Sequence, residues 1–207
     1  MNIQVLGAHN CETKNAKLTT LLVDDALAID AGALTSSLSL QAQQNLKAIL
    51  LTHLHYDHIR DIPAIAMNLF LSGSSTNIYS TPSVYEALST HLLNGKLYPN
   101  YFKQPPENPT LKFTAIEPDK VEQIEGYSIL AVTVNHSVPA VGYYVTSPEG
   151  KTFFYTGDTG PGLADNCKHI SPQLLITEVT APNRYEKFAI QAGHLTPSLL
   201  KQELIAL

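Results

Sequence analysis

Hydrophobic residues occur in short runs separated by polar turns, and this pattern predicts strands interleaved with helices. Apolar or alternating runs of four to eight residues, bounded by turn-forming residues, are typical of strands. The predicted strands fall at 3–6, 20–23, 26–29, 48–51, 77–80, 127–134, 141–146, 151–155 and 174–177. The run at 48–51 is apolar throughout, which indicates a strand buried on both faces.

Apolar residues at helical spacing predict helices at 36–45 and 62–71. The Thr-Pro pairs at 81–82 and 196–197 each begin a further helix, because Thr suits the N-cap and Pro suits the first turn. The polar, aromatic and proline-bearing segment 95–108 is expected to be irregular. Strands and helices interleave in two similar halves, so we expect an α/β protein with two sheets packed face to face and helices outside.

Composition limits the class of protein. The chain has 207 residues, 44% hydrophobic and 15% charged, so we expect one well-buried domain over residues 1–207. It shows neither an apolar run long enough for a membrane helix nor a secretory signal, so we expect a cytoplasmic protein that does not contact membranes. The net charge of −5 provides no basic track for nucleic acid. The two cysteines, Cys11 and Cys167, are too few for a disulfide framework.

The strongest chemical signal is the segment 52–58, Thr-His-Leu-His-Tyr-Asp-His, directly after the fully apolar strand. In extended backbone, residues i and i+2 point the same way, so His53 and His55 can direct their imidazoles to one point. Asp57 and His58 follow where the chain turns into the next helix and can face an adjacent point. Solvated loop histidines are the alternative, but this composition and spacing favour ligands for two nearby metal ions.

Two more residues are candidate ligands because each lies just beyond a predicted strand. His136 follows the strand 127–134, and Asp158 follows the strand 151–155 with glycines nearby that let the backbone turn. A carboxylate can bridge two cations, since it has one oxygen for each. Alone, Asp158 would be read as a turn aspartate. Together with the segment 52–58, both residues become ligand candidates.

The segment 53–58, His-Leu-His-Tyr-Asp-His, resembles the HxHxDH signature of the metallo-β-lactamase superfamily. Asp30-Ala31-Gly32, His136 and Gly157-Asp158-Thr159 fall in the order that this superfamily shows, so the resemblance covers nearly the whole chain. It implies a four-layer αββα sandwich. It also implies these ligands: His53, His55 and His136 for the first metal, Asp57 and His58 for the second, and Asp158 as the bridge.

Finer likeness points to the phosphodiesterase branch of the superfamily. The segment 136–143 resembles the one after the third histidine in ribonuclease Z and in class II cyclic-nucleotide phosphodiesterases. The segments 178–180 and 193–197 are similar to the paired glutamate and histidine elements of both groups. The run 194–204 looks more like the class II phosphodiesterases, and no long glycine-rich arm for gripping tRNA is seen.

The resemblance therefore implies a metal-dependent hydrolase, and most specifically a phosphodiesterase that acts on cyclic nucleotides through a hydroxide shared by two metal ions. Zinc is the expected divalent metal, with manganese or iron as alternatives. Asp57 would orient the hydroxide as well as bind metal. The alternatives are a tRNA 3′-end endonuclease with RNA as substrate, a lactone or thioester hydrolase, and a non-catalytic metal-binding relative. A homodimer is the expected assembly.

The chain also departs from the family pattern near its end. The family usually continues into another strand that ends in a further histidine ligand, whereas this sequence stops at Leu207. Either His194 is that ligand, or the fold lacks its last strand and His194 is a proton donor supported by Glu178. The second interpretation is favoured, because the helix start after His194 matches the family's proton-donor element. His169 is expected to lie at the surface.

The aromatic residues Tyr98, Tyr101 and Phe102 lie in the irregular segment and invite a second interpretation. They could stack a nucleobase. Aromatic residues in loops more often pack locally or at a subunit contact, and we favour that interpretation. Ser137 and Thr159 are next to candidate ligands and could orient them through hydrogen bonds.

Overall fold

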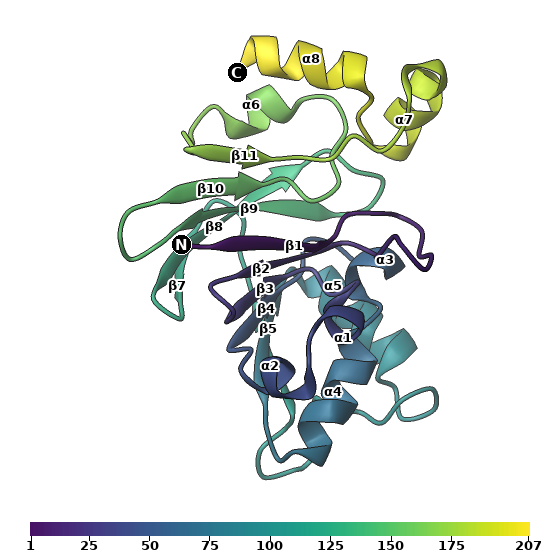
Figure 1. The fold of residues 1–207 in the computed structure, drawn as a ribbon, viewed down its shortest axis with the longest axis vertical. Coiled ribbons are helices and arrows are strands. Elements are labelled where there is room, and N and C mark those ends of the chain that lie inside the picture. Colours follow the sequence, from purple (N-terminus) through teal and green to yellow (C-terminus); the bar gives the residue numbers. More distant parts are fainter. The chain divides into compact units, whose positions relative to one another are not determined.

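The computed structural model describes residues 1–207 and divides into two compact units, Met1–Ile116 and Glu117–Leu207. Each unit contains one sheet and its own helices (Figure 1). That the two units make up a single domain stays a prediction. None of the helices combines the length and the apolar composition that crossing a bilayer requires.

The first unit contains a mixed sheet of six strands in the order β1-β2-β3-β4-β5-β6. The strands are β1 (Ile3–Gly7), β2 (Thr20–Val23), β3 (Leu27–Ile29), β4 (Ala48–Leu50), β5 (Thr76–Ser80) and β6 (Leu111–Ala115). β2 is antiparallel to both β1 and β3, whereas β3 to β6 are parallel to their neighbours. Five strands therefore run in one direction, and the chain leaves all five at the same edge of the sheet.

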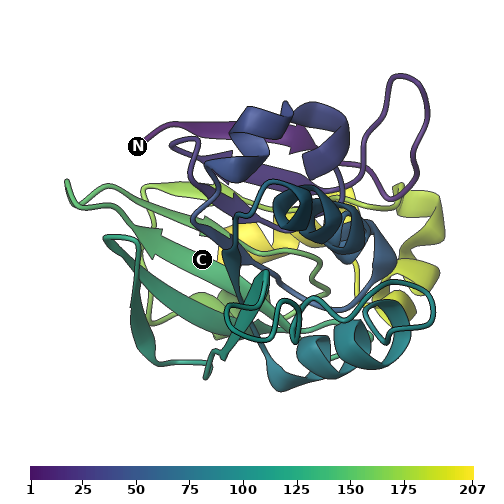
Figure 2. The same cartoon turned by 90° about the horizontal axis from the view of Figure 1, so that it is seen from below.

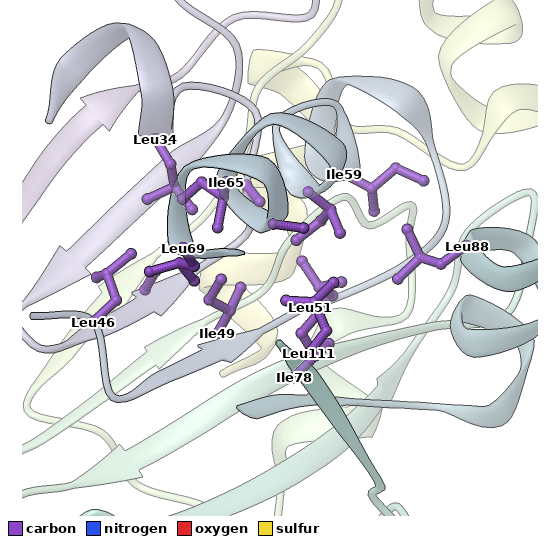
Figure 3. Close-up of a cluster of buried hydrophobic side chains, with 14 of the residues drawn as sticks. Leu34, Leu46, Ile49, Leu51, Ile59, Ile65, Leu69, Ile78, Leu88 and Leu111 are labelled. Atoms are coloured by element: carbon purple, nitrogen blue, oxygen red, sulfur yellow. The ribbon is translucent and has the colours of Figure 1, made fainter. Parts of the chain in front are cut away.

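The helices of this unit gather on one side of the sheet (Figure 1). They are α1 (Leu34–Ser37), α2 (Leu40–Gln44), α3 (Tyr56–Ile59), α4 (Ile62–Leu71) and α5 (Pro82–Ala87), which continues into the π-helical turn η1 (Leu88–Leu92). Figure 3 shows Ile65 and Leu69 of α4 pointing toward Ile49 of β4, Ile78 of β5 and Leu51, which directly follows β4. Because such side chains are completely buried, each contributes roughly 1.5–3 kcal/mol of transfer free energy.

The aromatic residues of the irregular segment pack locally. Tyr101 is only 1% exposed and donates a hydrogen bond to the sulfur of Met67. The Phe102 ring lies 5.1 Å from the Tyr85 ring, and Tyr98 is packed against the same core. Burial, reinforced by Tyr98, raises the pKa of the Tyr101 phenol. In this structure the segment supports the core of the first unit, as the favoured interpretation expected.

The connection between β1 and β2, residues 8–19, is the purple loop that projects in Figure 2. Two contacts hold it to the rest of the unit. Glu12 pairs with Arg60 just after α3, and the Lys17 ammonium donates to Ser36 O and Ser37 Oγ at 2.9 Å each. The loop is thus fastened through Glu12, in its exposed part, and through Lys17, near its end.

The second unit contains a five-stranded sheet in the order β11-β10-β9-β8-β7. The strands are β7 (Val121–Ile124), β8 (Tyr127–Val134), β9 (Ala140–Thr146), β10 (Thr152–Tyr155) and β11 (Leu174–Ile176). β10 and β11 are parallel, and the other pairs are antiparallel. β8, β10 and β11 therefore run in the same direction and end at the same edge.

Three helices accompany this sheet: α6 (Leu163–Cys167), α7 (Glu186–Ala192), which follows a 3-10 turn η2 (Asn183–Tyr185), and α8 (Pro197–Ala206). Leu163 and Cys167 of α6 pack against Val132 and Phe154 of the sheet. α8 contacts α6, as Figure 1 shows. Its Glu203 carboxylate accepts hydrogen bonds from the backbone N–H of Gly162 and Ala164, at 2.8 and 2.9 Å. These bonds satisfy donors at the start of α6 that have no partner within the helix.

Most predicted elements are confirmed within one or two residues, but the helix expected at 36–45 is wrong. The chain instead forms α1 and α2, because Leu38 is extended and Ser39 caps α2 by accepting a hydrogen bond from Ala42 N. The pattern did not predict β6, β7, α6 or α7. β7 has the sequence Val-Glu-Gln-Ile, and its polar centre carries no strand signal.

Candidate metal centre

In the first unit, the candidate ligands come from segments that leave parallel strands at the same edge. Asp30 directly follows β3, and His53 lies three residues after β4. His55 is the N-cap of the short helix α3, which places Asp57 and His58 on its first turn. The topology therefore brings one carboxylate and a ligand-rich segment together.

Asp30 is completely buried and binds three groups of this segment. Its carboxylate accepts hydrogen bonds from Thr52 N (2.9 Å), from Thr52 Oγ1 (3.0 Å) and from His58 Nδ1 (2.7 Å). Asp30 also adopts a left-handed backbone conformation, with φ of 61°, which aspartate tolerates better than most residues. A single carboxylate thus fixes both ends of the segment 52–58.

These hydrogen bonds also determine the protonation of two imidazoles. Because a carboxylate only accepts, His58 carries its proton on Nδ1, and its lone pair lies on Nε2. The Thr52 hydroxyl donates to Asp30 and therefore accepts from Nδ1 of His53, 3.0 Å away. His53 consequently also presents its lone pair on Nε2. Fixing the tautomer in this way is how proteins prepare histidine for metal binding.

The distance between two of these nitrogens fits a common cation. His53 Nε2 and His55 Nδ1 lie 3.1 Å apart. Two nitrogen ligands at about 2.0–2.1 Å from a tetrahedral zinc ion would be separated by about 3.3 Å. The residues present therefore fit a divalent metal such as zinc. His53 is completely buried and His55 is partly exposed.

Asp57 and His58 form the other part of this cluster. Asp57 Oδ2 lies 3.5 Å from His58 Nε2, and the ring centroids of His53 and His58 are 4.2 Å apart. Gly32 permits this arrangement, since a Cβ on Gly32 would lie 2.0 Å from the Asp57 carbonyl oxygen. The Asp30-Ala31-Gly32 segment thus supplies both the anchoring carboxylate and the space for the Asp57 backbone.

Charged residues after α3 link the ligand segment to two other parts of the unit. Arg60 pairs with Glu12 of the β1–β2 loop and, at 2.9 Å, with Asp61, which also accepts from Thr35 N at 2.7 Å. Burial lowers the pKa of Arg60, but its hydrogen bonds and charge interactions with Asp61 and Glu12 outweigh this, so the pKa is raised above its usual value. Arg60 therefore stays charged and holds the β1–β2 loop beside the segment 52–58.

In the second unit, candidate residues follow the three strands that end at one edge. His136 lies two residues after β8, Asp158 three residues after β10, and Glu178 two residues after β11. His194 comes from the turn between α7 and α8. The sheet topology again explains why residues distant in sequence come together.

His136 is oriented by the backbone at the end of α7. Its Nδ1 donates a hydrogen bond to Gly193 O at 2.8 Å, so the lone pair of the ring lies on Nε2. Gly193 has φ of 73°, and a Cβ there would lie 2.6 Å from His136 Cα. Glycine is therefore required at this position by both conformation and space. The His136 and His194 rings are 5.0 Å apart.

The loop that carries Asp158 is tied to the loop that carries His136. Asn135 O accepts a hydrogen bond from Gly160 N at 2.5 Å, and Asn135 Nδ2 donates to Pro161 O at 2.6 Å. Asp158 itself is 7% exposed and follows Gly157, which has φ of 59°. A buried carboxylate held on such a loop is suited to bind a cation.

Glu178 organises the remaining part of this cluster. Its carboxylate accepts hydrogen bonds from His194 Nδ1 (2.7 Å), Thr159 N (3.1 Å) and Thr180 N (2.8 Å). His194 Nδ1 lies 3.9 Å from Asp158 Oδ2, and ligand atoms of Asp158, Glu178 and His194 all lie within 4.8 Å of one another. Because the Glu178 oxygens already bind N–H donors, this residue is better suited to position His194 than to bind metal.

The structure thus brings the candidate residues together within each unit. His53, His55, Asp57 and His58 are neighbours in the first unit, and His136, Asp158, Glu178 and His194 are neighbours in the second. His169 lies at the surface, 3.6 Å from Asp119. Sequence reasoning missed the roles of Asp30 and Thr52, although an acidic residue followed by Ala-Gly directly after a strand was a visible signal.

Two mixed sheets flanked by helices, together with clusters of His and Asp at the strand ends, define the α/β metallo-β-lactamase fold. Residues 20–206 match the family model described as "Beta-lactamase superfamily domain". The chain therefore belongs to the metallo-β-lactamase superfamily and carries the His/Asp clusters typical of its hydrolases.

Three known proteins illustrate the likeness. A stretch of 102 residues is 33% identical to ribonuclease Z of Pyrococcus abyssi (strain GE5 / Orsay), and this match spans 47% of the chain but only 30% of that enzyme. Unliganded yeast PDE1 has a TM-score of 0.80 at 16% identity, covering 99% of this chain and 81% of PDE1. The short form of human tRNase Z (ELAC1) has a TM-score of 0.70 at 19% identity, covering 100% and 88%. At such low identity, the two structures establish the fold alone.

Proposed function

We propose that this chain is a phosphodiesterase that binds two divalent metal ions and hydrolyses cyclic nucleotides. The observation that carries the proposal is that hydrogen bonds fix the tautomer of three imidazoles. His53, His58 and His136 each have Nδ1 engaged by a neighbouring acceptor, which leaves the Nε2 lone pair for a cation. Such preparation has no purpose in histidines that are merely solvated.

The proposed metal ligands are the six residues that the sequence predicts. His53, His55 and His136 would hold the first ion, Asp57 and His58 would hold the second, and Asp158 would contribute to both. Bound divalent cations would supply a water acidic enough to attack at neutral pH and would neutralise charge on the phosphoryl oxygens. Asp57 would also orient the attacking water. Zinc is the metal we propose, since imidazole and carboxylate ligands suit it, with manganese or iron as alternatives.

His194 is the proposed proton donor to the leaving alkoxide. Glu178 accepts a hydrogen bond from His194 Nδ1 at 2.7 Å, which leaves Nε2 to deliver a proton. General acid help of this kind contributes about 10²–10⁴-fold to a rate. Glu178 acts through His194 and is a positioning residue. The alternative role for His194, a ligand of the second ion, would require Nε2 to remain unprotonated.

A tRNA 3′-end endonuclease is the second candidate, and the ribonuclease Z relative is the observation that favours it. RNA binding relies on Lys and Arg contacts with phosphates. The net charge of −5 argues against an extended RNA surface on this chain. The small phosphodiester is therefore the preferred substrate. A cytoplasmic location and a homodimer stay predictions from the sequence.

Metal analysis combined with a phosphodiesterase assay tests the proposal. Protein loaded with zinc should contain about two ions per chain and hydrolyse bis-p-nitrophenyl phosphate. Cyclic AMP should then be cleaved in preference to precursor tRNA. The reverse preference would favour the endonuclease, and turnover of a lactone or thioester alone would favour another hydrolase. Full metal occupancy without any turnover would favour a non-catalytic relative.

A further inference from the structure

An open hollow of about 580 Å³ lies in the second unit, beside the His136 loop. It is formed by the β8–β9 connection, by the loop after β10 and by α7 with its C-terminal turn. Its size falls within the roughly 300–1,000 Å³ of small-molecule sites. We call it the α7 hollow and define it by six of its lining residues: Ser137, Val138, Pro139, Pro161, Ile190 and Gln191.

The wall of the α7 hollow combines apolar and uncharged polar side chains and contains no Asp, Glu, Lys or Arg. Val138, Pro139 and Pro161 supply aliphatic surface, and Ile190 is 49% exposed although it is a large apolar residue. A phosphate chain or an RNA backbone would need cations here, and none is present. The occupant must therefore be an uncharged group with apolar faces.

Two side chains add polar groups to this wall. Ser137 and Gln191 are both exposed, and neither side chain forms a hydrogen bond with another residue. The Gln191 amide offers both a donor and an acceptor, a pairing that matches the edge of a nucleobase. A planar heterocycle combines two apolar faces with a polar edge, which is the combination that this wall accommodates.

The α7 hollow is directly continuous with a proposed metal ligand. His136 and Gly193 both line it, and His136 is held there by its 2.8 Å hydrogen bond to Gly193 O. A group seated in the hollow would touch the His136 loop while its attached phosphate reached the imidazole side. We propose that the α7 hollow binds the nucleobase of the substrate and that Gln191 determines which base is accepted. The identity of the attached phosphodiester rests on the proposed function.

Binding of product-like probes tests this inference without any turnover. Wild-type protein should bind at least one of the four nucleoside 5′-monophosphates about ten-fold more tightly than ribose 5-phosphate, measured by calorimetry. In Gln191→Ala this preference for the base should fall, and in Gln191→Trp, which fills the hollow, it should disappear. Gln202→Ala is the matched control, because Gln202 is an exposed glutamine on α8. It should retain the wild-type preference.

Kinetics then separate this inference from the proposed function. If phosphodiesters are hydrolysed but every nucleotide binds no better than ribose 5-phosphate, the base site is wrong and the phosphodiesterase stands. If the base preference is present and depends on Gln191 but no phosphodiester is cleaved, the base site stands and the phosphodiesterase fails. A base preference that is unchanged in Gln191→Trp would overturn the assignment to this hollow.

Discussion

The two candidate clusters are built in different ways. In the first unit, three histidines and one aspartate lie within six residues, and one buried carboxylate, Asp30, holds both ends of their segment. In the second unit, the candidate residues span positions 136–194 and come from four connections. Their positions depend on contacts between loops, such as His136 with Gly193 and Asn135 with Gly160.

This difference has a consequence for folding and binding. A contiguous segment fastened by one carboxylate keeps its geometry as long as that carboxylate is present. A cluster assembled from separate loops needs several weak contacts at once, and each costs chain entropy to form. We therefore expect the first cluster to respond sharply to one or two substitutions, and the second to respond moderately to many.

The largest expected effect is from His55→Ala. Because His55 is a proposed ligand whose Nδ1 lies 3.1 Å from His53 Nε2, its removal should abolish metal binding at that position and hydrolysis together. Metal content per chain and turnover of bis-p-nitrophenyl phosphate check this outcome. His91→Ala is the matched control, since His91 is exposed on η1, and both readouts should be unchanged. Normal metal stoichiometry in His55→Ala would contradict the ligand assignment.

The next largest effect compares the two anchoring carboxylates. Asp30→Asn places an amide N–H against a buried donor, either Thr52 N or His58 Nδ1. This should lower the free energy of unfolding by about 1–3 kcal/mol and metal affinity by about 10–100-fold. Glu178→Gln also loses an acceptor, but its side chain is 10% exposed, so water can compensate in part and the stability loss should be smaller.

Denaturant unfolding and metal titration measure both substitutions, and the pH dependence of kcat separates their roles. Glu178→Gln should reduce kcat more than metal affinity, because it acts on the protonated form of His194. Equal losses of stability in the two variants would contradict the claim that the first cluster depends on a single buried carboxylate.

The same comparison explains what the sequence could reveal. The segment 52–58 was recognisable because its ligands are adjacent and their spacing has a direct geometric meaning in extended backbone. His136 and Asp158 could be proposed only from their places after strands, because the contacts that orient them are made by residues distant in sequence. The hydrogen bond from His136 to Gly193 spans 57 positions and leaves no local pattern.

The fold shows a similar limit. Strongly apolar strands such as β4 and β8 were predicted, since burial leaves a hydrophobic signature. α6 was not, because it is a five-residue helix whose start is satisfied by Glu203 from α8 rather than by a capping residue of its own. Elements that are stabilised mainly by tertiary contacts carry weak local signals.

Glycine substitutions give a finer comparison of the clusters. Gly32→Ala places a Cβ 2.0 Å from Asp57 O, and Gly193→Ala places one 2.6 Å from His136 Cα with φ of 73°. Each substitution should lower the free energy of unfolding by roughly 1–3 kcal/mol through overpacking. At Gly193 the positive φ adds backbone strain. Gly73→Ala is the control, since its φ of 68° is similar but no atom lies within 4 Å. The Gly73→Ala substitution should cost only about 1–2 kcal/mol, from the left-handed backbone conformation alone.

Thermal unfolding and metal titration of these three variants check the expectation. Gly32→Ala should weaken metal binding because it displaces the Asp57 backbone, and Gly193→Ala because it displaces His136. Gly73→Ala should leave metal affinity unchanged. If Gly193→Ala were no more harmful than Gly73→Ala, the close approach of the α7 turn to His136 would not contribute to the second cluster.

The smallest expected effect concerns the contact between α8 and the segment that connects β10, past Asp158, to α6. Glu203→Gln removes the charge that accepts from Gly162 and Ala164 and should destabilise by about 0.5–1.5 kcal/mol, as loss of a helix cap does. Cys167 reports the change, because burial, reinforced by the Glu203 charge, raises the pKa of its thiol to about 11. Removing that charge lowers the pKa and increases the thiolate fraction.

Alkylation by iodoacetamide between pH 8 and 10 measures this effect. In the native wild-type chain, the exposed Cys11 should react first and Cys167 much more slowly, whereas Cys167 of Glu203→Gln should react faster while Cys11 is unchanged. Cys11 lies in the first unit, so it is an internal control for the reagent. Equal rates for Cys167 in both proteins would show that Glu203 does not hold the start of α6, and the second cluster would then depend on fewer contacts than proposed.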